Sequence, residues 1–134
     1  MKHLDVASAV VLKDGKILAM RRGPEKNPAT AMKWEFPGGK VEPGETPAQT
    51  VERELMEEMS YEVHPVRRLV KVDQDYPGFS ITLDAWLCSA DSFDFIRKEH
   101  IDSRWIPLEE LSADVLDWAP ADRKIVAAIL PILR

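Results

Sequence analysis

The chain has 134 residues, of which 45% are hydrophobic, and its 18 Lys and Arg against 23 Asp and Glu give a formal net charge of −5. This length suits one domain over residues 1–134 and is short for two, and the acidic balance disfavours a broad surface for polymeric DNA or RNA. No apolar run approaches the roughly 20 residues of a membrane span, and the first residues do not resemble a secretory signal. We therefore expect a cytoplasmic protein without a membrane partner, in which the lone Cys88 is a small buried hydrophobe.

The first elements predict an antiparallel hairpin. An apolar stretch from Val6 to Leu12 is followed by Asp14-Gly15, which is typical of a tight turn, and then by the apolar segment 17–20. Residues 23–33 are polar and contain two prolines, so they predict a loop, and residues 34–36 resume an apolar alternation.

A helix is predicted next, from residue 47 to about residue 60. Thr46 as N-cap, Pro47 in the first turn and Gln49 three residues after the cap form a capping box. Apolar residues at helical spacing predict one core-facing stripe: Ala48, Val51, Leu55 and Met59.

The second half predicts strands at 62–72 and 80–88 around a turn at 76–79, and a short strand near 104–106. One helical turn is expected at 107–111 and a last helix at 120–130, with Pro131 ending or kinking it. Strands interleaved with two helices predict an α/β (α+β) sandwich around a mixed sheet.

Three carboxylates carry the first indication of chemistry. Glu54, Glu57 and Glu58 stand at i, i+3 and i+4, so they share one face of the predicted helix and repel one another. A hard divalent cation such as Mg²⁺ or Mn²⁺ would offset that repulsion. The alternative is a solvated acidic helix face, but a loop containing Gly38 and Gly39 leads directly into the helix, and glycines let the backbone approach a metal or phosphate closely.

Together these residues resemble the motif of the Nudix hydrolase family. The motif runs here as Gly39, Glu45, Arg53-Glu54-Leu55, Glu57-Glu58 and Ser60-Tyr61, and every charged position matches. Ser60 departs from it, because the family usually has glycine there, where a left-handed residue ends the helix at a cost of about 1 kcal/mol for a non-glycine.

The resemblance extends along the chain and is similar to the MutT branch, through segments 19–22, 34–40, 44–47, 81–83 and 118–122. It implies an α/β/α sandwich with a mixed central sheet. It also implies that a metal is held by the carbonyl of Gly38 or Gly39 and by Glu54, Glu57 and Glu58, while Arg53 pairs with Glu45 or a neighbouring carboxylate. Glu99, six residues before Trp105, matches a further carboxylate that ligates metal or assists the water; the alternative is an exposed loop glutamate.

The implied reaction is attack of a metal-activated water on a nucleoside triphosphate, at the β-phosphorus, to give a nucleoside monophosphate and pyrophosphate. The resemblance favours Glu54 as base, although family members differ in which carboxylate takes the proton.

The base of the nucleotide is the open question. Asp122 stands where the 8-oxoguanine-selective branch tends to have Asn and CTP-type relatives have Asp. An ionised Asp only accepts hydrogen bonds and suits the amino group of cytosine, whereas a protonated Asp in a dry pocket imitates Asn; the alternative is an acid favoured by a helix N-terminus. The candidate substrate-binding residues are Arg22, Phe36, Lys40, Phe79 and Asp122, with Trp34, Tyr76 and Trp118 as further stacking candidates, although surface arginines and core aromatics are ordinary.

These observations predict a Mg²⁺-dependent pyrophosphohydrolase acting on a small nucleoside triphosphate, with 8-oxo-dGTP ranked before CTP or a modified dCTP and a non-nucleotide diphosphate third. Rivals from other classes are a non-catalytic nucleotide sensor and a structural interaction domain. The sequence leaves open whether the protein is a monomer or a homodimer.

Overall fold

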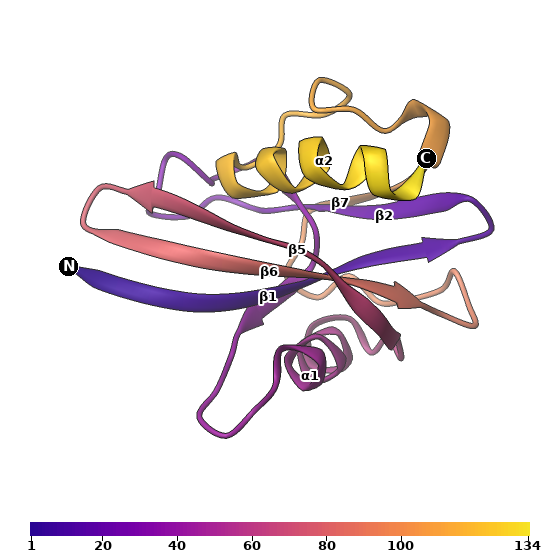
Figure 1. Ribbon diagram of the computed structural model, residues 1–134, viewed down its shortest axis with the longest axis horizontal. Helices are drawn as coiled ribbons and strands as arrows, with labels where there is room; N and C mark the ends of the chain where they lie inside the picture. Colours follow the sequence, from indigo (N-terminus) through magenta and orange to yellow (C-terminus); the bar gives the residue numbers. More distant parts are fainter.

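The strand β1 (Lys2–Lys13) lies at the centre of a seven-stranded mixed sheet in the computed structural model, which describes residues 1–134 (Figure 1). It pairs in parallel with β6 (Phe79–Ser89) and antiparallel with β2 (Lys16–Arg21) and β4 (Gly38–Lys40). The sheet is completed by β3 (Trp34–Glu35) and β7 (Asp102–Pro107), which pair with β2, and by β5 (His64–Tyr76), which pairs with β6. The predicted mixed sheet is confirmed.

One helix covers each face of this sheet, α1 (Pro47–Met59) on one side and α2 (Pro120–Leu133) on the other (Figure 1). The residues of β1 contribute alternately to the hydrophobic cores on the two faces of the sheet, because neighbouring strand residues point to opposite faces. Ala7, Ala9 and Val11 pack with the α1 residues, and Val10 packs with the α2 residues. The architecture is the expected α/β/α sandwich.

The predicted hairpin and helix start are confirmed in detail. Asp14 and Gly15 both take positive φ, as a tight turn between antiparallel strands requires. The Thr46 hydroxyl accepts from the Gln49 amide, the Gln49 side chain accepts from the Thr46 amide, and the helix ends at Ser60 with φ 49°. Ser60 thus occupies the left-handed position at which the family usually has glycine.

Several boundaries differ from the prediction, since β1 begins at Lys2 and not at Val6, and residues 38–40 form β4 where a loop was expected. The strand β5 continues to Tyr76 because Tyr76 pairs with Phe79 and their rings stack 5.0 Å apart, so the turn shrinks to Pro77 and Gly78. Pro131 was expected to end or kink the last helix, and it does not end it, since α2 runs to Leu133. The fixed φ of proline is itself helical, so the chain continues in a helix past Pro131 although the backbone hydrogen bond from that residue is lost.

The loop after β2 and the turn after β7 follow the predicted pattern. Residues 23–33 form a loop, and a single 3₁₀ turn, Leu108–Glu110, follows β7. Cys88 is buried, and burial raises the pKa of its thiol to about 12, as expected for a small hydrophobe. None of the helices combines the length and apolar character needed to span a membrane.

Candidate active site

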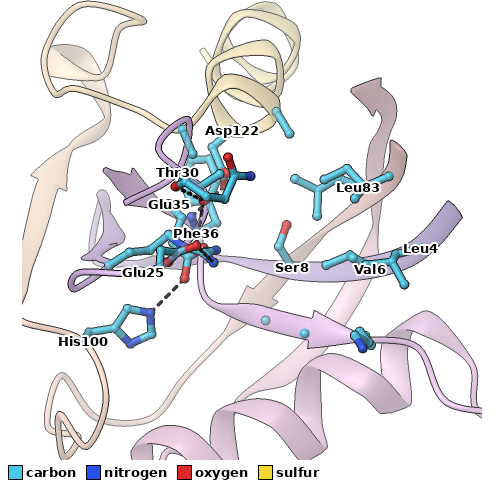
Figure 2. Close-up of a pocket in the computed structure, with 18 of the residues that line it drawn as sticks. Leu4, Val6, Ser8, Glu25, Thr30, Glu35, Phe36, Leu83, His100 and Asp122 are labelled. Carbon is cyan, nitrogen blue, oxygen red and sulfur yellow. Dashed lines mark hydrogen bonds and ion pairs between the residues drawn. The ribbon is translucent and has the colours of Figure 1, made fainter. Parts of the chain in front are cut away.

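A cavity of about 600 Å³ opens beside β1, between the sheet, the loop after β2 and the start of α2. Its volume is within the range of about 300–1,000 Å³ that is common for small-molecule sites. Figure 2 shows Leu4, Val6 and Leu83 on one side of the hollow and the polar groups of Glu25 and His100 on the other. The cavity therefore offers both an apolar surface and a set of fixed charges.

Asp122, in the first turn of α2, is buried in this cavity with 6% of its surface exposed. One of its carboxyl oxygens accepts a hydrogen bond from the Phe36 amide at 2.9 Å (Figure 2). Burial, followed by the negative charge of Glu35, raises the pKa of Asp122 well above its ordinary value. The structure thus favours the neutral carboxyl, which both donates and accepts a hydrogen bond.

Phe36 and Phe79, two of the predicted substrate-binding residues, line the cavity, and so does Tyr76. The Phe36 ring is 2% exposed and lies 5.1 Å from the ring of Trp118, so it is a fixed wall. Trp34 and Trp118 are buried outside the cavity lining and belong to the hydrophobic core on the α2 side.

Arg22 is held by carboxylates and is not a free surface arginine. It donates to Glu25 at 2.6 Å and to Glu35 at 2.7 Å, while Thr30 donates to Glu25 and His100 contacts Glu35 at 2.9 Å. Burial lowers the pKa of Arg22, but these carboxylates outweigh it and the pKa is raised. This network ties the loop after β2 to β3 and to residue 100.

The sequence analysis missed the partners of Arg22, Glu25 and Glu35, and the residues that bond those two carboxylates, Thr30 and His100. Glu35 carried a usable signal in the sequence, because it is a charged residue between two aromatic ones, Trp34 and Phe36. Both aromatic residues are buried in the structure. His100 comes from a loop 65 residues away, and no local pattern pairs it with Glu35.

Arg53, on α1, joins the glycine loop to the helix. It donates to both Glu45 oxygens at 2.7 and 2.9 Å, to Glu54 at 2.9 Å, to Glu57 at 3.2 Å and to the Lys40 carbonyl at 3.1 Å. Hydrogen bonds from Arg53 and then Thr50 lower the pKa of Glu45 to about 2. The expected pairing of Arg53 with Glu45 is present, and it uses the guanidinium as a fork.

Glu54 lies directly against Gly39. A Cβ placed on Gly39 would lie 2.3 Å from the Glu54 carboxyl carbon and 2.6 Å from each oxygen, so only glycine leaves room for this carboxylate. Burial raises the pKa of the neighbouring Glu58 to about 8, aided by a hydrogen bond to Glu54 and by the charges of Glu54, Glu35 and Glu99. The negative charges of Glu35, Glu54 and Glu99 therefore all disfavour ionisation of Glu58 at this end of the site.

The predicted residues fall into two neighbouring groups. The cavity is lined by Arg22, Phe36, Gly38, Gly39, Lys40, Glu58, Phe79, Glu99 and Asp122. Arg53, Glu54 and Glu57 lie beside it on α1, where the Glu57 side chain is 60% exposed and reaches Arg53. No three His, Cys, Asp or Glu side chains in the structure are arranged as a complete metal-binding group.

The donor chemistry of this end nevertheless fits a hard divalent cation. Carboxylate oxygens are the ligands that Mg²⁺ and Mn²⁺ prefer. The Glu54–Glu58 contact sets like charges against each other, which adds to the effect of burial in raising the pKa of Glu58, and a cation between them would remove that repulsion.

Comparison with known proteins gives a consistent family match. Residues 1–129 match the NUDIX domain. The chain is 35% identical over 130 residues to an 8-oxo-dGTP diphosphatase of Escherichia coli K12, covering 96% of this chain and 98% of that protein. It is 33% identical over 132 residues to a CTP pyrophosphohydrolase of the same organism, covering 98% and 95%. Among solved structures, the solution structure of the E. coli ORF135 protein superposes with a TM-score of 0.80 at 33% identity, covering 98% of this chain and 91% of that one.

Proposed function

The chain belongs to the NUDIX family and is a nucleotide diphosphatase-type hydrolase, and from that premise we propose that it hydrolyses 8-oxo-dGTP to the monophosphate and pyrophosphate with Mg²⁺ or Mn²⁺. One observation carries this proposal. The same cavity contains the buried carboxyl group of Asp122 and the edge of a carboxylate cluster, which it reaches at Gly38, Gly39 and Glu58. A nucleotide needs both, since its base is recognised by stacking and hydrogen bonds and its phosphates by a metal.

The cofactor would be held by Glu54 and Glu58, with the carbonyl of Gly38 or Gly39 and with Glu57 or Glu99 as further ligands. When bound, a divalent ion neutralises phosphate charge and lowers the pKa of a water. Arg53 keeps the Glu54 carboxylate in place through its 2.9 Å hydrogen bond, and Gly39 leaves the space that this carboxylate fills.

Glu54 takes the proton from the attacking water in this scheme. The water oxygen forms a bond to the β-phosphorus while the bond from that phosphorus to the α–β bridging oxygen breaks. The bridging oxygen leaves with the nucleoside monophosphate, and the water oxygen remains in pyrophosphate. The support for this role is the position of Glu54 against the glycine loop and under Arg53.

The raised pKa of Asp122 supports 8-oxoguanine as the base. A neutral carboxyl has one donor and one acceptor, as the side chain of Asn has, and therefore suits the O6 and protonated N7 edge of 8-oxoguanine. Phe36 supplies a rigid aromatic wall beside it.

CTP or a modified dCTP is the second candidate. Its support is the aspartate itself, because an ionised Asp122 would accept from the exocyclic amino group of cytosine, together with the 33% identity to a CTP pyrophosphohydrolase. The dissolved nucleotide pool, and so the cytoplasm, is the place of action that either substrate implies. A non-catalytic nucleotide sensor is the alternative of another class.

The test is a substrate panel with Mg²⁺: 8-oxo-dGTP, dGTP, CTP, 5-methyl-dCTP and ADP-ribose, with release of monophosphate and pyrophosphate as readouts. Glu54→Gln and Glu57→Gln probe the cluster, and Glu52→Gln, an exposed residue on the same helix, is the matched control.

Preference for 8-oxo-dGTP over dGTP, lost in Glu54→Gln and kept in Glu52→Gln, would support the proposal. Preference for the cytosine nucleotides would move the assignment to the second candidate. Hydrolysis of none of the five, with nucleotide binding retained, would favour the sensor.

A further inference from the structure

The hydroxyl of Ser8 is a buried polar group that the fold leaves without a partner. Ser8 is 2% exposed, and its Oγ makes no hydrogen bond within the protein. It lines the cavity, and Figure 2 shows its oxygen directed away from β1 into the hollow that Leu83 and Asp122 also line. Because buried hydroxyls are nearly always paired and an unpaired one is costly, this atom calls for a partner from outside the chain.

The strand geometry fixes where this hydroxyl points. Leu4, Val6, Ser8 and Val10 share one face of β1 by alternation, and Ser8 is the polar residue among them. Ser8 pairs with Gly38 on β4, where a Cβ would come within 2.7 Å of the Ser8 Cα. The two backbones are therefore packed closely, and the serine side chain cannot move away from the cavity by a shift of its strand.

Two other polar residues of the cavity are held by carboxylates. Arg22 is engaged by Glu25 and Glu35, and Nε2 of His100 contacts Glu35. Nδ1 of His100 is also unpaired, but Figure 2 places this residue on the opposite side of the hollow from Leu4 and Val6. Ser8 is thus the unpaired polar side chain of the apolar part of the pocket.

We propose that Ser8 Oγ hydrogen-bonds the polar edge of the nucleotide base and so helps determine which base the enzyme accepts. This inference rests on the proposed function. A base suits the position better than a phosphate, because the neighbours Val6 and Leu83 are apolar. Of the two Lys or Arg residues that line the cavity, Arg22 is paired with carboxylates and Lys40 is exposed on β4. A neutral hydroxyl that both donates and accepts matches a neutral heterocycle edge.

The experiment compares the wild-type protein with Ser8→Ala. The probe is the monophosphate of the triphosphate that the wild type hydrolyses fastest, 8-oxo-dGMP or CMP, titrated by calorimetry with Mg²⁺. Loss of one neutral hydrogen bond should weaken binding about five-fold. Inorganic pyrophosphate, which has no base, should bind both proteins equally. Ser89→Ala, an exposed serine at the end of β6, is the control variant.

Thermal unfolding of the nucleotide-free protein provides the second readout. Because Ser8 Oγ has no partner within the chain, Ser8→Ala should unfold at the same or a higher temperature. Unchanged monophosphate binding would overturn the inference, as would an equal loss for pyrophosphate with a lower unfolding temperature, since that pattern indicates a structural role. Failure of the proposed function is recognised separately, because the wild type would then hydrolyse neither 8-oxo-dGTP nor CTP.

Discussion

Substituting Gly39 by alanine should disable the site while leaving the fold intact. The new Cβ would lie 2.3 Å from the Glu54 carboxyl carbon, and ordinary contact begins near 3.4 Å, so the carboxylate must recede by about 1 Å. A misplacement of about 1 Å in a catalytic group can reduce rate about 100-fold. We therefore expect kcat/KM for the preferred triphosphate to fall by about two orders of magnitude, with little change in thermal unfolding because the displaced group is the end of a flexible side chain.

Gly38→Ala is the matched comparison for this experiment. A Cβ there would lie 2.0 Å from the Ala7 carbonyl oxygen and 2.7 Å from the Ser8 Cα, both in the backbone of β1. That clash separates β4 from β1, so the expected result is a large loss of thermal stability. The two variants should thus show their defects in different assays. Gly39→Ala should lose activity in steady-state kinetics, and Gly38→Ala should unfold at a lower temperature. Wild-type kcat/KM in Gly39→Ala would refute the reasoning.

Three further substitutions test other parts of the site. Arg53→Lys should lower kcat/KM by about 10- to 100-fold, because a point charge cannot hold Glu45, Glu54 and Glu57 as the guanidinium fork does; unaltered kinetics would contradict this. The stability contributed by Asp122 is full below its ordinary pKa and is lost as pH rises through its raised folded pKa. The unfolding temperature of Asp122→Asn should accordingly gain on that of the wild type as pH rises above the ordinary aspartate pKa of 3.8. A difference between the two unfolding temperatures that shrinks as pH rises would count against this. Ser60→Gly should raise the free energy of unfolding in denaturant by about 1 kcal/mol, since φ is 49° there; no change would show that the left-handed serine is unstrained.

The parts of the fold that could be predicted from the sequence are those with local chemical signals. Asp14-Gly15 specified its turn, and Thr46 with Gln49 specified the start of α1, because capping and turn geometry depend on a few adjacent residues. The end of β5 was misplaced because Tyr76 and Phe79 are held by pairing between two strands. Similarly, α2 continues past Pro131, because the fixed φ of proline is itself helical.

The candidate site also contains residues that local sequence patterns predicted and residues that meet only through the tertiary fold. The residues around Glu54 were found because one helix and the loop before it bring them together within about two dozen positions. His100 and Glu35 meet only through the tertiary fold. Ser8 lies within the apolar stretch of β1, and only the cavity beside it gives its hydroxyl a role.

The most direct test of the central claim is product analysis after hydrolysis of 8-oxo-dGTP in water enriched in ¹⁸O, with Mg²⁺ present. The account predicts 8-oxo-dGMP and pyrophosphate, with the heavy oxygen in pyrophosphate, since the water attacks the β-phosphorus. Release of orthophosphate with a nucleoside diphosphate, or heavy oxygen found in the monophosphate, would contradict it.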